Sequence, residues 1–481
     1  MAQCGFGRAA VNDVWRGKYP FGTDLEGRFL YVRDGEAQWL LAAFDFSYMF
    51  RRTSGAWRRR VSEETGIPFE NIWEHELQNH SAPTATDLDG EPGEIALVER
   101  CLPAIREAMK GAQEAELAYV LPDLGTRFNM NREQYIPGLG MVTVWAGCEF
   151  DEQDRPHCED PAVMLLEDWK PQLPAFEKPI YFDRPADPQG ALLVFRTPAG
   201  EMLGSLARFA AHADVTGAAV WDWGRGDMAE YRYNWDWPGY LRGRVEQALG
   251  GTCVCTCGPC GNLSTKKRTV RGYEAGDRQA RRIGAGVADA LIEEWEGAAP
   301  PWRPLTLGGQ AHGILHLPMR ASFPRDRREV AEATERAEEL TRAHRAAIDA
   351  GECPARIKQL IDQMHHWQWA GKMVDQWIGL SDEELARGAF PIEIQALRLG
   401  ELVLAGLPGE SLCETSTWLR AQSMGMRLVA LDQINSACIY HAGSVDMDLG
   451  GYAATCNPLA RHATSLTRER ALELIRKVMP R

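Results

Sequence analysis

The sequence has no run of 18 or more apolar residues, so no segment is predicted to cross a membrane as a helix. Its first residues, MAQCGFGRAAVNDVW, lack a basic stretch followed by a long apolar core, which favours a cytoplasmic location over secretion. No basic stripe offsets the net charge of −14, and such an acidic chain argues against nucleic acid as a partner. The sequence also has no internal repeat and no low-complexity tract. Because these absences argue against a membrane span and against nucleic acid, we expect the partner to be a small molecule.

Cysteine is distributed unevenly along the chain. There are 12 cysteines, and the stretch CVCTCGPC holds four of them: Cys253, Cys255, Cys257 and Cys260. The reducing cytosol would keep them as thiols. On a strand the first three share one face, about 6.5–7 Å apart, which is too far for easy sharing of one ion. We therefore predict small apolar fillers in a buried strand. A thiolate cluster that binds zinc or Cu(I), and a nucleophilic Cys260, are the alternatives.

Apolar residues make up 45% of the 481, which is ample for a packed core. The runs FLYVRD and WLLAAFDFS predict a β-hairpin, and residues 51–66 predict a helix closed by glycine. Further helices are predicted at 238–249 and as a pair at about 325–379, and a long loop insertion at about 127–190. The pattern predicts one mixed α/β domain over residues 1–481, with a β-rich core and flanking helices.

Polar side chains follow several of the predicted strands. His75 and His80 lie in HELQNHSAP, and His212 comes directly after an apolar strand, with Asp214 placed to orient its imidazole. Glu410 ends the apolar strand LVLAGLPGE, where a carboxylate is costly unless it is paired, binds metal or faces solvent. Helix capping is the structural alternative for Glu410.

Aromatic residues are concentrated in the tract WDWGRGDMAEYRYNWDW, residues 221–237. Six tryptophan and tyrosine side chains there would either line a partly apolar pocket or pack under a long loop. The sequence leaves both readings open.

Eight short blocks follow one another in an order that resembles the neutral/alkaline ceramidase superfamily. In chain order they are CGFGRAAVN, ENIWEHELQNHSAP, FNMNREQY, RFAAHADVTG, NWDWPGYLRGRVE, CGPCGNLS, LGELVLAGLPGES and NSACIYHAGSVDMDLGGYAAT. The resemblance covers about residues 4 to 465 and is nearest to the short bacterial branch without the C-terminal immunoglobulin-like domain. It implies a neutral-ceramidase-like catalytic domain.

The resemblance also implies a metal site. In that family two histidines, the glutamate of a PGE motif and a tyrosine hold one zinc ion, which polarises an amide carbonyl or activates the attacking group. By position, His212, Glu410 and Tyr440 match these ligands. Gln78 stands where the first histidine of the THTHS motif would be, and His80 matches the second. Three outcomes are open: His80 replaces the lost ligand, as we predict, or a water does, or the site has lost its metal.

Two further residues gain implied roles from the same resemblance. Arg132 matches the arginine of the family's NRS loop, which implies a group that orients a carbonyl or stabilises an oxyanion. Ser264 matches the nucleophilic serine of GDVSP, although Asn262 and Thr265 stand where that motif has aspartate and proline.

The leading hypothesis is therefore a zinc-dependent amidohydrolase. The Zn²⁺ ion would be held by His80, His212, Glu410 and Tyr440, with Ser264 or a metal-bound water attacking the carbonyl and Arg132 and Tyr440 stabilising the oxyanion. The expected substrate is a small amide or related acyl compound, partly apolar or ring-bearing, rather than ceramide. The alternative is a catalytically decayed or repurposed relative that binds metal or a partner through the cluster Cys253–Cys260, or uses Cys260 as nucleophile.

Overall fold

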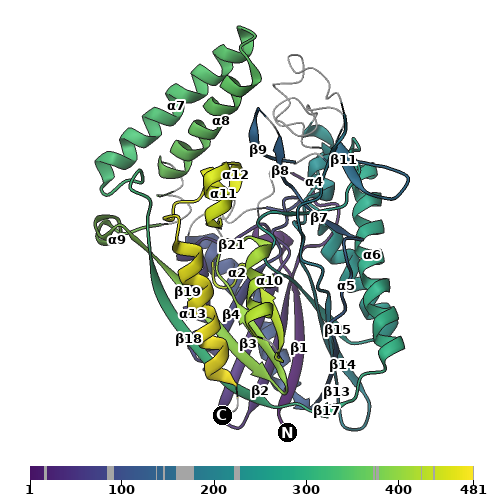
Figure 1. Ribbon diagram of the computed structural model, residues 1–481. Coiled ribbons are helices and arrows are strands. Elements are labelled where there is room, and N and C mark those ends of the chain that lie inside the picture. Colours follow the sequence, from purple (N-terminus) through teal and green to yellow (C-terminus); the bar gives the residue numbers. More distant parts are fainter. Residues whose placement is uncertain are drawn as a thin grey trace.

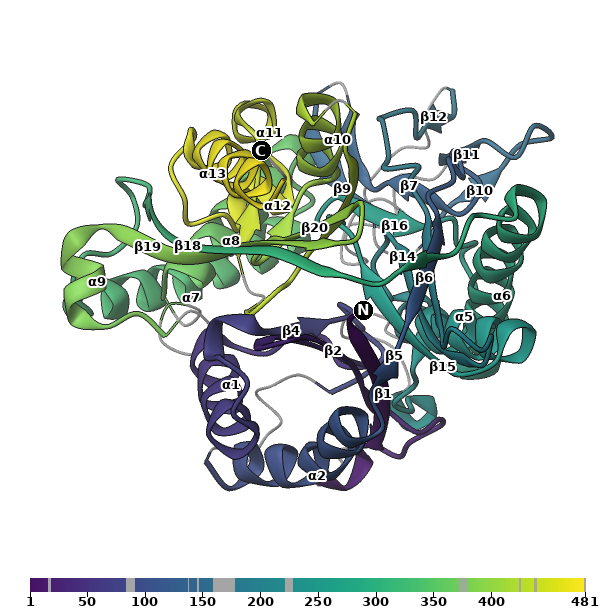
Figure 2. The same ribbon diagram turned by 90° about the horizontal axis from the view of Figure 1, so that it is seen from below.

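Three large β-sheets surround a shared apolar core in the computed structural model (Figure 2). The structure describes all residues except 16–18, 84–90, 137, 145–146, 159–177, 221–227, 372–373, 375–378, 424, 437–438 and 480–481. The first sheet has the order β4-β3-β2-β1-β5, built from Ile72–Glu76, Ala37–Phe44, Glu26–Asp34, Gln3–Ala10 and Gln113–Glu114. The second has the order β15-β14-β13-β6-β17, built from Thr252–Cys257, Met202–Phe209, Ala191–Arg196, Glu116–Val120 and Arg303–Pro304. The third has the order β18-β19-β20-β22, built from Leu307–Pro318, Ala389–Leu399, Leu402–Gly406 and Arg427–Leu431.

Helices cover the outer face of each sheet (Figures 1 and 2). The first sheet carries α1 (Arg51–Thr65) and α2 (Glu91–Lys110), and the second carries α5 (Asp236–Leu249) and α6 (Tyr273–Ala298). The third is covered by α13 (Ala463–Val478). The mixed α/β prediction is confirmed.

The long apolar runs of the sequence are strands buried on both faces. On β2, Leu30 and Val32 point into the core shared by the sheets, whereas Phe29 and Tyr31 pack under the helices. The hairpin predicted from FLYVRD and WLLAAFDFS is β2 and β3, and α1 ends at Gly66 as predicted. Two-sided burial explains why these strands read as nearly continuous apolar runs rather than as alternating ones.

The segment between β18 and β19 forms the predicted helical pair, α7 (Arg327–Asp349) and α8 (Pro354–Gln368). The two helices pack against each other beyond the end of the third sheet (Figure 1). Among the described residues, no helix combines the length and apolarity that a membrane span requires.

The segment predicted as a loop insertion holds six short strands in its described part, and these the prediction did not include. The strands are β7 (Asn129–Asn131), β8 (Glu133–Ile136), β9 (Gly140–Thr143), β10 (Glu149–Phe150), β11 (Pro156–Cys158) and β12 (Ile180–Tyr181). Runs of two to four residues carry too little periodicity to be recognised from sequence. The partner of β7 is β16 (Leu263–Thr265), more than a hundred residues along the chain. Residues 159–177 of the insertion lie outside the described residues.

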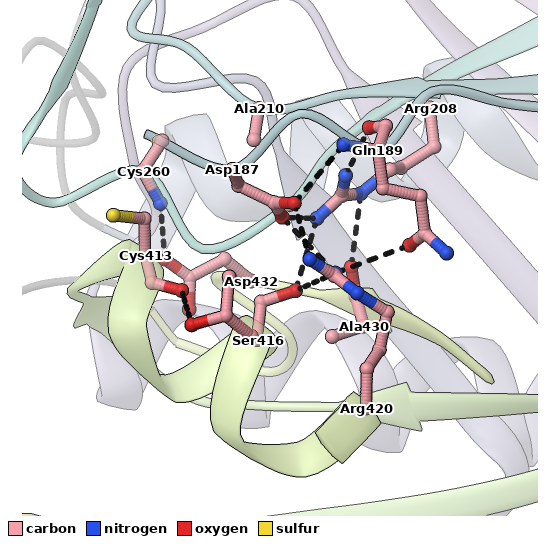
Figure 3. Close-up of polar contacts among 12 residues, drawn as sticks. Asp187, Gln189, Arg208, Ala210, Cys260, Cys413, Ser416, Arg420, Ala430 and Asp432 are labelled. Atoms are coloured by element: carbon pink, nitrogen blue, oxygen red, sulfur yellow. Dashed lines mark hydrogen bonds and ion pairs between the residues drawn. The ribbon is translucent and has the colours of Figure 1, made fainter. Parts of the chain in front are cut away.

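A buried ion-pair network joins the second sheet to α10 (Cys413–Gln422), beside the third sheet (Figure 3). The Asp187 carboxylate accepts hydrogen bonds from Arg208 at 2.6 Å and from Arg420 at 2.6 Å, and both arginines also contact Ser416 Oγ. Asp187 and Arg208 are fully buried. Burial alone would raise the pKa of Asp187, but the two arginines outweigh it and lower that pKa to about 2. The network holds Asp187 as a carboxylate.

Candidate active site

The predicted site residues follow strands of all three sheets and meet at one end of the molecule. Parallel pairing aligns the carboxyl ends of β3 with β4, β14 with β15, and β20 with β22. Figure 1 shows this end of the sheets, near β7 and β21, away from both chain termini. The segments that follow these strands, which include the short strands β16, β21 and β23, carry His80, His212, Ser264, Glu410 and Tyr440.

His212 is fully buried, and both its ring and its backbone are hydrogen-bonded. Its Nδ1 lies 3.0 Å from the Leu263 carbonyl oxygen, and its own carbonyl accepts a hydrogen bond from Trp237 Nε1 at 3.0 Å. Burial, followed by the Arg132 charge, lowers the pKa of His212, so the ring is neutral near pH 7. The proton then resides on Nδ1, and Nε2 presents a lone pair to the site. Asp214, expected to orient this ring, instead contacts Ser264 and Lys267, so the backbone carbonyl takes that orienting role.

Glu410 and Tyr440 are brought together by a short parallel strand pair. β21 (Glu410–Ser411) pairs with β23 (Tyr440–His441) in the register Glu410↔Tyr440. Glu410 Oε2 lies 3.2 Å from His212 Nε2. Burial alone would raise the pKa of Glu410, but its interactions with neighbouring side chains, among them the Arg132 guanidinium and the Tyr440 hydroxyl, lower it overall. Burial and the neighbouring Glu410 raise the pKa of Tyr440 well above its usual range, so the phenol keeps its proton.

Arg132, between β7 and β8, places its guanidinium among these side chains. Its Nη2 lies 2.8 Å from the Gly261 carbonyl oxygen, 3.1 Å from His212 Nε2 and 3.3 Å from Tyr440 Oη. Its backbone N–H donates to the Asn262 carbonyl at 2.8 Å, and its side chain is buried. Gly261 lies so close to Glu410 that a Cβ there would meet the Glu410 carbonyl at 2.8 Å. The CGPCGNLS loop therefore packs directly against β21.

Ser264 is buried on β16, and its Oγ donates to Asp214 Oδ1 at 3.4 Å. The other carboxylate oxygen of Asp214 lies 2.6 Å from Lys267 Nζ, and Lys267 is almost completely buried. Reasoning from sequence missed Lys267. Its signal was a lysine pair, STKK, immediately after the candidate serine in an otherwise buried segment.

His80 lies beside His212 on the more exposed side of the site. Its backbone N–H donates to the Ala213 carbonyl at 2.8 Å, and its ring stacks on that of His212 at a centroid distance of 5.6 Å. Burial and the neighbouring His212 lower the pKa of His80 to about 4. Gln78, two residues earlier, is buried with a left-handed φ of 50°, and its Oε1 has no hydrogen-bond partner among the described residues.

Two groups of predicted candidates have structural roles. Both ring nitrogens of His75 bind backbone, with Nδ1 2.8 Å from the Asp432 carbonyl and Nε2 accepting from the Cys257 N–H at 2.9 Å. In the aromatic tract, Tyr231 and Tyr233 pack in the core below the first sheet, and Trp221 and Trp223 lie outside the described residues.

The aromatic side chains that do reach the site come from elsewhere in the sequence. Trp369, just after α8, and Tyr452 lie 6.2 Å and 5.7 Å from the Tyr440 ring, measured between centroids. The site therefore has an aromatic wall on the Tyr440 side.

The cysteine cluster divides between two parts of the core. Cys253 and Cys255 pack under α5 and α6, as the filler prediction expected, whereas Cys257 and Cys260 lie with Leu263 behind the site. The Cys257 and Cys260 sulfurs are 3.3 Å apart, and both thiols are fully buried. The hydrogen bond between them and burial raise the pKa of Cys260 well above its usual range, which makes it a poor nucleophile.

Comparison with known proteins gives a fold and no closer relationship. No protein-family model matches the sequence, and no curated protein sequence matches it. The chain has a neutral ceramidase-like fold. It superposes on the crystal structure of neutral ceramidase from Pseudomonas aeruginosa with a TM-score of 0.62 at 14% identity, covering 100% of this chain and 75% of that one. A second ceramidase structure, of a complex, gives a TM-score of 0.61 at 14% identity, covering 100% and 76%.

The residues that meet here do not fit a zinc site with four protein ligands. Gln78 offers only an amide oxygen, a poor zinc ligand beside imidazole. The Arg132 guanidinium contacts two of the three remaining ligand atoms. In the part of the chain that the structure describes, no three His, Cys, Asp or Glu side chains are grouped to hold a metal.

Gly409 allows β21 and β23 to approach each other, and its replacement tests that alignment. Its φ is 66°, and a Cβ there would lie 2.5 Å from the Ile439 carbonyl oxygen. We expect Gly409→Ala to lower the free energy of unfolding by about 1–3 kcal/mol and to reduce turnover, measured by urea unfolding and steady-state kinetics. Gly400→Ala is the matched control, because its φ is 59° but no atom of the described residues lies within 4 Å of a Cβ placed there. Equal effects in both variants would show that the contact with Ile439 is unimportant.

Proposed function

We propose that this chain is a hydrolase of amide or related acyl bonds. The observation that carries the proposal is the convergence of Arg132 Nη2, His212 Nε2 and Tyr440 Oη beside the loop that holds Ser264. Hydrogen-bond donors fixed in a water-poor site stabilise the negative oxygen that forms when a carbonyl is attacked. The neutral ceramidase-like fold supports this class of reaction.

In the proposed reaction Ser264 Oγ attacks the substrate carbonyl carbon and forms a tetrahedral intermediate. Its proton passes to Asp214, whose carboxylate accepts the Ser264 hydrogen bond, and from there to the leaving amine or alcohol. Arg132 and Tyr440 donate hydrogen bonds to the oxyanion. Water then cleaves the acyl-serine, which releases a carboxylic acid and restores Ser264. His80 borders the site on its more exposed side, where the departing group leaves.

We further propose a small, partly apolar substrate. The support is the aromatic wall of Trp369, Tyr440 and Tyr452, which suits an acyl or ring-bearing group on one side of the scissile bond. The tract at residues 221–237, the original reason for expecting such a substrate, gives no support in its described part.

A panel of N-acyl amides and matching esters tests the proposal, with release of acid and amine or alcohol followed by mass spectrometry. We expect turnover of at least one member, and a loss of about 10²–10³-fold in kcat for Tyr440→Phe, which removes one oxyanion donor. Tyr135→Phe is the matched control, because Tyr135 is exposed on β8. Absence of any acid release by the wild-type chain, or unchanged kcat in Tyr440→Phe, would contradict the proposal.

A further inference from the structure

The centre of this site contains buried hydrogen-bond acceptors that need a positively charged neighbour. Glu410 Oε2 and His212 Nε2 lie 3.2 Å apart, and Nε2 also lies 3.1 Å from Arg132 Nη2, a group that can only donate, so both atoms act as acceptors. Two acceptors at that distance repel each other unless a positive group lies beside them. Both side chains are at most 7% exposed, so water screens the repulsion poorly. The arrangement therefore requires a cation.

Arg132 supplies that cation from within the chain. One nitrogen, Nη2, contacts His212 Nε2, Tyr440 Oη and the Gly261 carbonyl oxygen. The guanidinium stays charged at any pH at which the protein is folded. Its backbone is fixed by the Asn262 carbonyl on one side and by the Val144 N–H on the other, at 2.8 Å each. The fixed backbone and the three contacts of Nη2 hold the charge in place.

The charges around His212 are also balanced without a metal ion. The two carboxylates that face it are Glu410 and Asp214, and the two cations are Arg132 and Lys267. A divalent ion would bring an excess of two positive charges into a buried site. Gln78 stands in place of an imidazole ligand, whose stronger bond to zinc would have offset this excess of charge.

We propose that the Arg132 guanidinium takes the place of a metal ion in this site, and that the chain acts without a resident metal. The inference rests on the proposed hydrolase function for its role in catalysis. The metal content is measured independently of any activity. Gln78 stands where the resemblance places a zinc-binding histidine.

The first test is the zinc content of the wild-type chain, purified without chelators and measured by inductively coupled plasma mass spectrometry. We expect less than about 0.1 zinc per chain, and hydrolysis that changes by less than about twofold after dialysis against 1,10-phenanthroline. One zinc per chain that disappears in Glu410→Gln would overturn the proposal, whether or not the amide panel is hydrolysed. If no panel member is hydrolysed, the zinc measurement still decides this inference while the proposed function fails separately.

The second test restores a ligand and removes the guanidinium. We expect zinc titration calorimetry to show one site in the double variant Gln78→His/Arg132→Met and none in Gln78→His alone. Zinc binding by Gln78→His alone, with Arg132 present, would overturn the proposal because the guanidinium would then not exclude the ion. Circular dichroism and thermal unfolding establish that each variant is folded. The wild-type zinc content remains decisive if the double variant does not fold.

Discussion

Replacing Ser264 by alanine is expected to reduce kcat/KM by at least about 10³-fold, because the proposed reaction forms its covalent bond on that hydroxyl. Ser264 is fully buried, and its Oγ contacts the Asp214 carboxylate. The Asp214–Lys267 pair fixes the carboxylate on the serine side of the site. The change is measured by steady-state kinetics on the best member of the amide panel.

Intact-protein mass spectrometry separates covalent catalysis from attack by water. The wild-type chain, quenched in acid during turnover of an activated ester, is expected to gain the mass of the acyl group, and Ser264→Ala is not. Ser205→Ala is the matched control, because Ser205 is equally buried on β14 but belongs to the sheet interior. A Ser264→Ala chain that keeps its activity within about tenfold would identify water as the nucleophile.

Replacing Asp187 by asparagine is expected to lower the free energy of unfolding by about 3–5 kcal/mol, because it leaves the fully buried Arg208 without its ion-pair partner. Arg420 loses the same partner, so the link between α10 and the second sheet weakens (Figure 3). Urea unfolding at pH 7 measures the change. Asp448→Asn is the control: the Asp448–Arg461 pair is exposed, and its loss is expected to leave the free energy of unfolding nearly unchanged.

The effect of Asp187→Asn depends on pH in a defined direction. The pKa of Asp187 is about 2 in the folded protein and about 3.9 in an unfolded chain. Its stabilising contribution is therefore complete above about pH 4–5 and is lost as the pH falls toward 2. We expect the difference in unfolding free energy between wild type and Asp187→Asn to shrink over that range. A difference that stays constant down to pH 2.5 would contradict the assigned ion pair.

Much of the fold could be predicted because the relevant signals are local. Two-sided burial makes β2 and β3 nearly continuous apolar runs, and Gly66 closes α1 with a left-handed residue. The short strands between 129 and 181 were missed because their pairing comes from distant partners or from hairpins too short to show alternation. Pairing of that kind leaves no periodic pattern in the sequence.

The candidate site, too, could be predicted only in part. The positions of His212, Glu410 and Tyr440 were predicted from the motifs that carry them, and the structure brings these three side chains together with Arg132. The contact between Arg132 Nη2 and His212 Nε2 could not be predicted, because it depends on how β7 and β16 pair. The orienting group of His212 was assigned to Asp214 on sequence proximity, whereas the Leu263 carbonyl, distant in sequence, performs that role.

Because the site draws on strands from all three sheets, it can exist only after nearly the whole chain has folded. His80 belongs to a loop of the first sheet, His212 to the second, and Tyr440 follows the last strand of the third. Contacts over such sequence separations form late and slowly. During synthesis, the first two sheets would therefore leave the ribosome without an active centre, and any fragment that ends before Tyr440 would be inert. After dilution from denaturant, recovered activity would then report that all three sheets have assembled. A recovered circular-dichroism signal of helix would report only that local structure has formed.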